Sequence, residues 1–215
     1  MTRPSGAFHV ERAGGGALPC VPRETEERLR SFVDLLLLWN ARINLVSARS
    51  AEDAWRRHVL DALQLLPLLP PSPAPLLDLG SGGGFPGLVL ATANGEETHL
   101  VEADKRKAAF LSHAAGRLGL SNVRVHPRRI EGAPLPKGGA VTARALAPLP
   151  ELLRHAHSLL SPGGVALFPK GRTAERELTN ASRDWMMRVE RFPSRTDPES
   201  TIFRLSEIRP AGSEA

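Results

Sequence analysis

Residues 76–87 read LLDLGSGGGFPG, and this stretch decides the fold. A short apolar run, Leu76 to Leu79, leads into a loop with five glycines, and a helical pattern follows from Gly87. Glycine permits positive φ and lets the backbone approach a ligand closely, so such loops lie after the first strand of doubly wound α/β folds. A tight strand-to-helix turn without any ligand is the plainer interpretation of the same residues.

The spacing of the glycines narrows the choice of ligand. The dinucleotide pattern G-x-G-x-x-G would need glycine where Phe85 stands, and the phosphate-binding G-x-x-x-x-G-K-[ST] has no counterpart. The chain instead carries D-x-G-x-G-x-G over residues 78–84, and Glu102 follows 22 residues after Gly80. A carboxylate at that place can accept both hydroxyl hydrogens of a ribose. This pair of signals resembles the S-adenosylmethionine-dependent methyltransferases.

The remainder of the chain alternates between strand and helix patterns. Short apolar runs predict strands at 76–79, 99–102, 123–126, 140–143 and 165–168, and helical patterns lie at 87–93, 105–118, 149–160 and 174–184. Residues 187–192 and 201–208 predict a closing antiparallel pair. We therefore expect an α/β, Rossmann-like sheet of the class I methyltransferase type, mostly parallel, with an antiparallel C-terminal pair.

An N-terminal helical extension precedes this sheet. Leu29, Phe32 and Leu36 recur at helical spacing after Pro22, and a second helix is expected from Ser50 to Leu66. A proline-rich linker follows at 70–73. We therefore expect a flexible segment at 1–20, a helical cap at 21–70 and a methyltransferase domain at 71–215 that is a single compact unit.

The composition limits the remaining possibilities. The 215 residues include 28 Lys and Arg against 23 Asp and Glu, a net charge of +5 that suits a polyanionic partner without proving one. A single cysteine excludes a disulfide framework and a cysteine-rich zinc site, so we expect no metal. No apolar stretch approaches the length of a membrane span, and the first 20 residues lack the apolar core of a secretory signal. We expect a cytoplasmic protein that does not enter the membrane.

Five further strings, taken together with the glycine loop, resemble one family. These strings are Trp39-Asn40, Asn44-Leu45-Val46-Ser47, Arg57-His58-Val59-Leu60-Asp61, Ala143-Arg144-Ala145-Leu146-Ala147 and Lys170-Gly171. The combination is similar to the glucose-inhibited division protein B (RsmG) family of ribosomal RNA methyltransferases, over about residues 25 to 175. The resemblance implies methyl transfer from S-adenosylmethionine to N7 of a guanine in 16S ribosomal RNA.

The resemblance also implies which residues bind the cofactor. Carried over residue by residue, these are Gly80, Phe85, Ile130, Glu131 and Arg144, to which the spacing argument adds Glu102 on the ribose. Ile130 would offer an apolar face to the adenine. Asp78 is expected to accept backbone N–H bonds at the adjoining helix end and not to touch the ligand.

The catalytic residues stay unassigned at this point, because guanine N7 already carries a lone pair and needs no general base. The candidates for positioning the substrate are Arg144, Lys170, Asn44 and His58. Arg144 suits the methionine carboxylate or guanine O6, whereas Lys170 and Asn44 suit phosphate or base contacts. His58 either reaches the substrate or pairs with Asp61 three residues further on.

Two other functions are compatible with the same loop. One is a methyltransferase that acts on a small molecule or a protein, and the other is a non-catalytic nucleotide-binding assembly module. The basic charge and the N-terminal helices favour RNA. The family resemblance implies 16S ribosomal RNA or the small ribosomal subunit as the partner, and we expect a monomeric enzyme.

Overall fold

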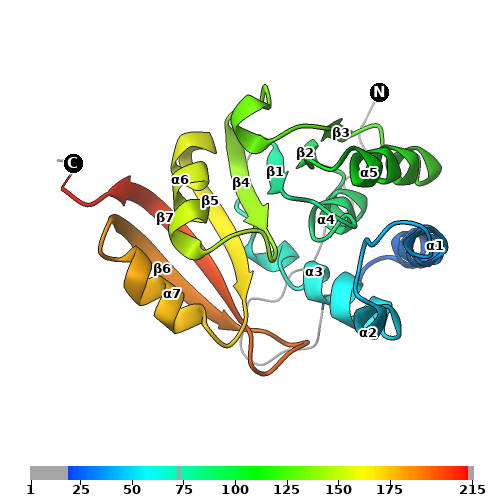
Figure 1. The fold of residues 1–215 in the computed structure, drawn as a ribbon, viewed down its shortest axis with the longest axis horizontal. Helices are drawn as coiled ribbons and strands as arrows, with labels where there is room; N and C mark the ends of the chain where they lie inside the picture. Colours follow the sequence, from blue (N-terminus) through cyan, green and yellow to red (C-terminus); the bar gives the residue numbers. More distant parts are fainter. Residues whose placement is uncertain (1–18, 72–73, 213–215) are drawn as a thin grey trace.

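A seven-stranded sheet forms the centre of the molecule in a computed structural model that describes residues 19–71 and 74–212 (Figure 1). The strand order is β3-β2-β1-β4-β5-β7-β6, in which β1 to β5 pair in parallel and β7 is antiparallel to both neighbours. The strands are β1 (Leu76–Leu79), β2 (Thr98–Val101), β3 (Val123–His126), β4 (Gly138–Ala143), β5 (Leu160–Lys170), β6 (Trp185–Pro193) and β7 (Thr201–Pro210). The predicted mostly parallel sheet with an antiparallel C-terminal pair is confirmed.

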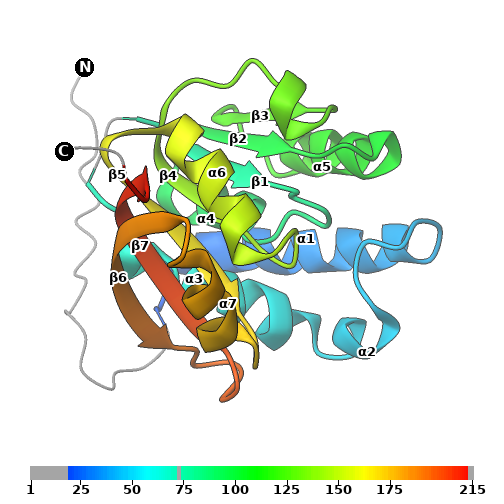
Figure 2. The same cartoon turned by 60° about the vertical axis from the view of Figure 1, so that its left-hand side comes forward.

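Helices cover both faces of the sheet. They are α1 (Arg23–Asn40), α2 (Ala48–Ala51), α3 (Asp61–Leu63), α4 (Gly87–Asn94), α5 (Lys105–Arg117), α6 (Leu149–Leu159) and α7 (Ala174–Ala181). Shorter turns of 3-10 or π type lie at η1 (Trp55–Leu60), η2 (Leu66–Leu68) and η3 (Ile130–Gly132). The helices α1, α4 and α5 lie on one face and α6 and α7 on the other (Figures 1 and 2). No helix in the described ranges is both long and apolar enough to span a bilayer.

The N-terminal helix shares the core of the sheet domain. Leu29, Phe32 and Leu36, the residues whose spacing predicted α1, are fully buried. The Phe32 ring lies 5.3 Å from Phe85 of the glycine loop and 6.2 Å from Phe110 of α5. Burial of aromatic rings is a large part of core stability, so α1 supports the loop directly. The boundary at residues 70 and 71 stays a prediction, and the segment predicted to be flexible lies, except for its last two residues, outside the described residues.

The second N-terminal helix differs from the prediction. It does not begin at Ser50, because the Ser47 hydroxyl already accepts the Ser50 backbone N–H (3.3 Å) and caps α2. The Asp53 carboxylate then accepts the Arg56 N–H (3.4 Å) and starts a separate stretch. The single predicted helix is therefore two pieces, and the second passes from a π-helical turn into α3.

Gly87, the first residue of α4, has no room for a side chain. A Cβ there would lie 2.5 Å from Leu100 Cδ2 and 2.6 Å from Asp78 Oδ2. We expect Gly87→Ala to lower the free energy of unfolding by about 2 kcal/mol through overpacking. Gly116, in the last turn of α5, serves as the control, because a Cβ added there would meet no atom within 4 Å. Gly116→Ala should be neutral or stabilising by up to about 1 kcal/mol. If urea unfolding showed the same loss of unfolding free energy for both variants, the overpacking at Gly87 would be contradicted.

Candidate functional site

The loop between β1 and α4 takes the backbone conformation that its glycines predicted. Gly80, Gly82 and Gly84 have φ values of +66°, +54° and +91°, a region that disfavours residues with a side chain. The Ser81 N–H donates to the carbonyl oxygen of Val101 (3.0 Å), which ties the loop to the end of β2. Gly80 and Gly82 are partly exposed, so their main chain lies at the carboxyl edge of the parallel strands, where ligands bind in open α/β sheets.

The side chain of Asp78 anchors the far end of this loop. Its fully buried carboxylate accepts a hydrogen bond from Thr142 Oγ1 of β4 (2.7 Å) and another from the Gly87 N–H (3.2 Å). These contacts confirm the expected bond to the helix end. Burial raises the pKa of Asp78 from 3.8 to about 6, although both hydrogen bonds act in the opposite direction.

The raised pKa of Asp78 predicts a pH dependence of stability. The folded chain binds this proton more tightly than the unfolded chain, so the Asp78 contribution to the free energy of unfolding falls as pH rises from about 4 to about 6. The expected size is about 3 kcal/mol. Asp78→Asn can still bond Gly87 and Thr142 and lacks the titration, so the difference between the two urea-unfolding profiles isolates the effect. Parallel profiles across this range would contradict it.

Glu102 lies directly after β2 and faces the glycine loop. It is 9% exposed, and its two oxygens accept the backbone N–H groups of Gly82 and Asp104, each at 2.8 Å. An ionised carboxylate offers about four acceptor positions, so each oxygen retains one for a further donor. A ribose with two neighbouring hydroxyl groups matches this donor requirement. The geometry therefore fits the ribose of S-adenosylmethionine beside the glycine loop.

Ile130 and Glu131 lie in η3, the short turn that follows β3. Ile130 is half-buried and packs against the core beneath α6. Glu131 is exposed, with Oε1 3.8 Å from His155 Nε2 and 3.9 Å from Arg154 Nη2 of α6. The two residues therefore occupy the same carboxyl edge of the sheet as Glu102. An apolar side chain at that edge fits an adenine ring, and the Glu131 carboxylate faces α6.

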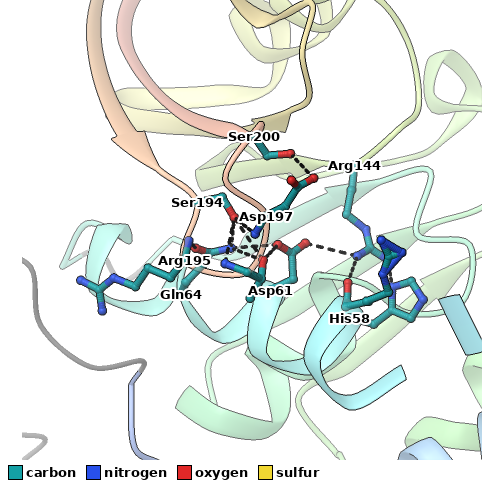
Figure 3. A network of polar contacts seen from close by, with 10 residues as sticks. His58, Asp61, Gln64, Arg144, Ser194, Arg195, Asp197 and Ser200 are labelled. Carbon is teal, nitrogen blue, oxygen red and sulfur yellow. Dashed lines mark hydrogen bonds and ion pairs between the residues drawn. The ribbon is translucent and has the colours of Figure 1, made fainter. Parts of the chain in front are cut away.

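Arg144 is the centre of a polar cluster at the end of β4 (Figure 3). Its guanidinium donates to the Arg57 carbonyl (3.2 Å), to Asp61 Oδ2 (3.3 Å) and to His58 Nδ1 (2.9 Å). The Arg144 Cζ also lies 5.3 Å from the centre of the Phe85 ring. Only 21% of the side chain is exposed. This planar cation is thereby held beside the last turn of the glycine loop.

His58 is partnered differently from the pairing considered in the sequence. Its side chain bonds Arg144 and not the Asp61 carboxylate, which binds the same arginine. Burial, together with the charges of Arg144 and Arg57, lowers the pKa of His58 to about 4. The ring is therefore neutral at pH 7, and the bond to Nδ1 assigns its proton to Nε2. It stacks 4.8 Å from Phe85, so Phe85 itself is a buried wall of this cluster.

A cavity of about 560 Å³ opens on the side of Arg144 that faces away from Phe85. Its walls come from η1 and α3, the β4–α6 loop, the end of β5 and the β6–β7 loop. The polar and charged residues among its lining are Ser50, Arg57, His58, Asp61, Arg144, Lys170, Glu177, Ser194, Thr196, Asp197 and Ser200. Leu146 also lines the cavity, and its Cδ1 lies 2.6 Å from the position of a Cβ on Gly80. Arg144 and Leu146 therefore separate this cavity from the glycine loop, and its volume suits a small ligand or a base.

Lys170 lines the cavity but has partners within the chain. Its ammonium donates to the Ala147 carbonyl (2.8 Å) and pairs with Glu177 (2.9 Å), and 11% of the side chain is exposed. Glu177 also accepts the Leu149 N–H (3.0 Å), so the pair fixes the β4–α6 loop. The Lys170 charge is therefore paired within the chain and supports the β4–α6 loop, which carries Arg144.

Asn44 is exposed in the loop between α1 and α2 and does not line the cavity. The neighbouring Asn40 organises this loop, because its side-chain oxygen accepts the N–H groups of Leu45 (2.8 Å) and Val46 (3.0 Å). The Leu45 carbonyl in turn lies 3.3 Å from the position of a Cβ on Gly83. Sequence reasoning missed Asn40, although it belongs to one of the family strings.

Comparison with known proteins assigns the chain to a family. A family model described as rRNA small subunit methyltransferase G matches residues 25–201. A protein from Granulibacter bethesdensis is 58% identical over 196 residues, covering 91% of this chain and 90% of the relative. One from Acidiphilium cryptum is 56% identical over 213 residues, covering 92% and 98%. Both carry the name Ribosomal RNA small subunit methyltransferase G.

Solved structures support the fold. A SAM-dependent methyltransferase from Aquifex aeolicus matches with a TM-score of 0.57 at 15% identity, covering 71% of this chain and 92% of that one. An O-methyltransferase from Bacillus cereus in complex with SAH gives 0.56 at 16% identity, covering 82% and 91%. At this identity the likeness concerns the fold alone. The family match and the two close relatives go further, and the chain belongs to the rRNA small subunit methyltransferase G (GidB) family.

Proposed function

We propose that this chain transfers a methyl group from S-adenosylmethionine to N7 of a guanine in 16S ribosomal RNA. One observation carries the proposal: Glu102 bonds the glycine loop at Gly82, Phe85 of the same loop lies against Arg144, and a cavity opens on the far side of that arginine. A donor site and an acceptor site side by side are what direct group transfer requires. The family relatives, which are named for the small ribosomal subunit, support RNA as the acceptor.

The residues that hold the donor would be those around the glycine loop. Gly80, against which the Leu146 side chain packs, would border the methionine part, Glu102 would accept the ribose hydroxyls and Ile130 would pack against the adenine. Glu131 would contribute its backbone, since its carboxylate faces α6. Phe85 would act as a wall that positions Arg144. When bound, S-adenosylmethionine supplies a methyl group on a positively charged sulfonium.

Arg144 and its neighbours would position the acceptor. The N7 lone pair forms the new C–N bond while the C–S bond breaks and its electrons stay on sulfur, so no proton has to leave N7. A neutral His58 with its Nδ1 occupied by Arg144 is consistent with a reaction that needs no general base. The rate enhancement would come from positioning and electrostatics. Lys170 would fix the loop that carries Arg144, and Asn44 would contact RNA at the surface.

The proposal extends to the oligomeric state, the location and the substrate of the enzyme. We infer a monomer that acts in the cytoplasm on 16S ribosomal RNA or on the small ribosomal subunit. The helices of residues 21–70 would form a cap beside the acceptor cavity, which Arg57 and Asp61 help to line.

The proposal is tested by incubating the purified chain with S-adenosylmethionine that carries a labelled methyl group. The acceptors are small ribosomal subunits, protein-free ribosomal RNA, DNA, free guanosine and a protein mixture. We expect label in the small-subunit RNA, either free or within the subunit. Label confined to guanosine or protein would overturn the RNA assignment. Absence of cofactor binding in calorimetry would instead indicate a non-catalytic module.

A further inference from the structure

The loop between β6 and β7, residues 194–200, is held to the N-terminal part of the chain by hydrogen bonds to Asp61 and Gln64. Thr196 Oγ1 donates to Asp61 Oδ1 (2.6 Å), and the Gln64 side-chain nitrogen donates to the same oxygen (2.8 Å). The Arg195 N–H donates to the Gln64 oxygen (2.9 Å). Figure 3 shows Asp61 and Gln64 beside Ser194 and Arg195 of this loop. The bond between Thr196 and Asp61 joins residues that are 135 apart in sequence.

The second oxygen of Asp61 faces the opposite wall of the cavity. Asp61 Oδ2 lies 3.3 Å from Nη1 of Arg144, and 17% of the Asp61 side chain is exposed. Within the described ranges, Asp61 is the only carboxylate within ion-pair distance of Arg144. The other acceptors of the guanidinium, a backbone carbonyl and the imidazole of His58, are neutral. A cation with so little access to water depends strongly on its ion-pair partner, and the Asp78 carboxylate adds only a weaker attraction from farther away.

We propose that Asp61 is a positioning residue for the methyl acceptor. One oxygen orients the guanidinium of Arg144, and the other holds the β6–β7 loop, so a single carboxylate sets two walls of the acceptor cavity. This inference rests on the proposed methyl transfer and assigns Asp61 no contact with the reacting atoms. Its effect on kcat passes through Arg144, and its effect on KM passes through the loop.

The first test compares Asp61→Asn with Asp53→Asn. The amide at position 61 can still accept from Thr196 and Gln64, but it turns an N–H donor toward Arg144. Asp53→Asn removes the same charge eight residues earlier, where the carboxylate is exposed, caps a local turn and acts on His58 only weakly through its charge. We expect Asp61→Asn to lower kcat on small subunits about 10-fold because Arg144 is misplaced. The cofactor Kd should stay unchanged, and Asp53→Asn should keep the wild-type kcat.

A double-mutant cycle separates this role from a general loss of structure. If Asp61 acts through Arg144, the Asp61→Asn/Arg144→Ala variant should have the kcat of Arg144→Ala to within about twofold. Losses that multiply would show that Asp61 acts independently of Arg144 and would overturn the inference. A kcat for Asp61→Asn equal to that of Asp53→Asn would overturn it as well.

Two variants of Thr196 test the contact between Asp61 and the β6–β7 loop. They keep the inference testable if Asp61→Asn does not fold. Thr196→Val removes the hydroxyl and keeps the shape, whereas Thr196→Ser keeps the hydroxyl. We expect Thr196→Val to raise KM for small subunits about 5-fold, because the loop loses the hydroxyl that bonds Asp61, and Thr196→Ser to restore it. Equal KM values for both variants and wild type would contradict the role of the loop. If the wild-type chain transfers no methyl group to RNA, the proposed function itself fails, and the two failures are thereby distinguished.

Discussion

Replacing Arg144 by alanine should lower kcat for methyl transfer to small ribosomal subunits by about 10² to 10³, the loss typical of removing one preorganised charged donor from an active site. Arg144 lies between the glycine loop and the cavity, with its guanidinium held by Asp61, His58 and the Arg57 carbonyl. Its removal takes away the cation that faces both proposed substrates. The measurement is single-turnover transfer of labelled methyl at saturating cofactor.

Arg144→Lys is the matched control for this prediction. Lysine keeps the positive charge but lacks the planar fork that bonds three partners at once, so we expect an intermediate kcat. Thermal unfolding of both variants checks that the fold persists. A kcat for Arg144→Ala within a factor of about two of wild type would return this residue to a structural role.

Glu102→Gln should weaken binding of S-adenosylmethionine about 100-fold, the upper range for losing hydrogen bonds to a charged group. Glutamine has one acceptor oxygen in place of two. It cannot accept the N–H groups of both Gly82 and Asp104 through separate oxygens, as Glu102 does. One of those N–H groups would face a side-chain NH₂, and the charged acceptor for the ribose would be lost. Isothermal titration calorimetry with S-adenosylmethionine measures the Kd.

Glu102→Asp supplies the comparison for the cofactor site. It keeps the carboxylate and shortens the side chain by one methylene, so we expect a loss of less than about 10-fold. Glu96→Gln, at an exposed position before β2, controls for the change of net charge. An unaltered Kd for Glu102→Gln would remove this residue from the ribose site and leave it as a loop anchor.

The fold could be predicted from the sequence because its signals are local. The strands at 76–79 and 123–126 match the structure residue for residue, and the helix predicted from Lys105 begins there because the Asp104 side chain caps it. The glycine pattern determined the conformation of the loop, since positive φ at Gly80, Gly82 and Gly84 depends on the residues themselves. Parallel strands then bring Glu102 to the same edge as the loop.

The polar cluster around Arg144 could not be predicted in the same way. Asp61 and Thr196 bond across 135 residues of sequence, and no local spacing encodes such a contact. His58 and Asp61 stand three residues apart, which favoured a mutual pair, but a third residue from the end of β4 lies between them and bonds both. The Ser47 cap was missed because Ser50 fits the same local pattern three residues later, and only the backbone geometry distinguishes them.

The most direct test of the account is mass mapping of the methylated nucleotide after reaction of the purified chain with small ribosomal subunits and S-adenosylmethionine. We predict a single oligonucleotide of 16S ribosomal RNA that carries one added methyl group on guanine, at N7. Methylation at another atom, on another base or on a ribosomal protein would contradict the central claim.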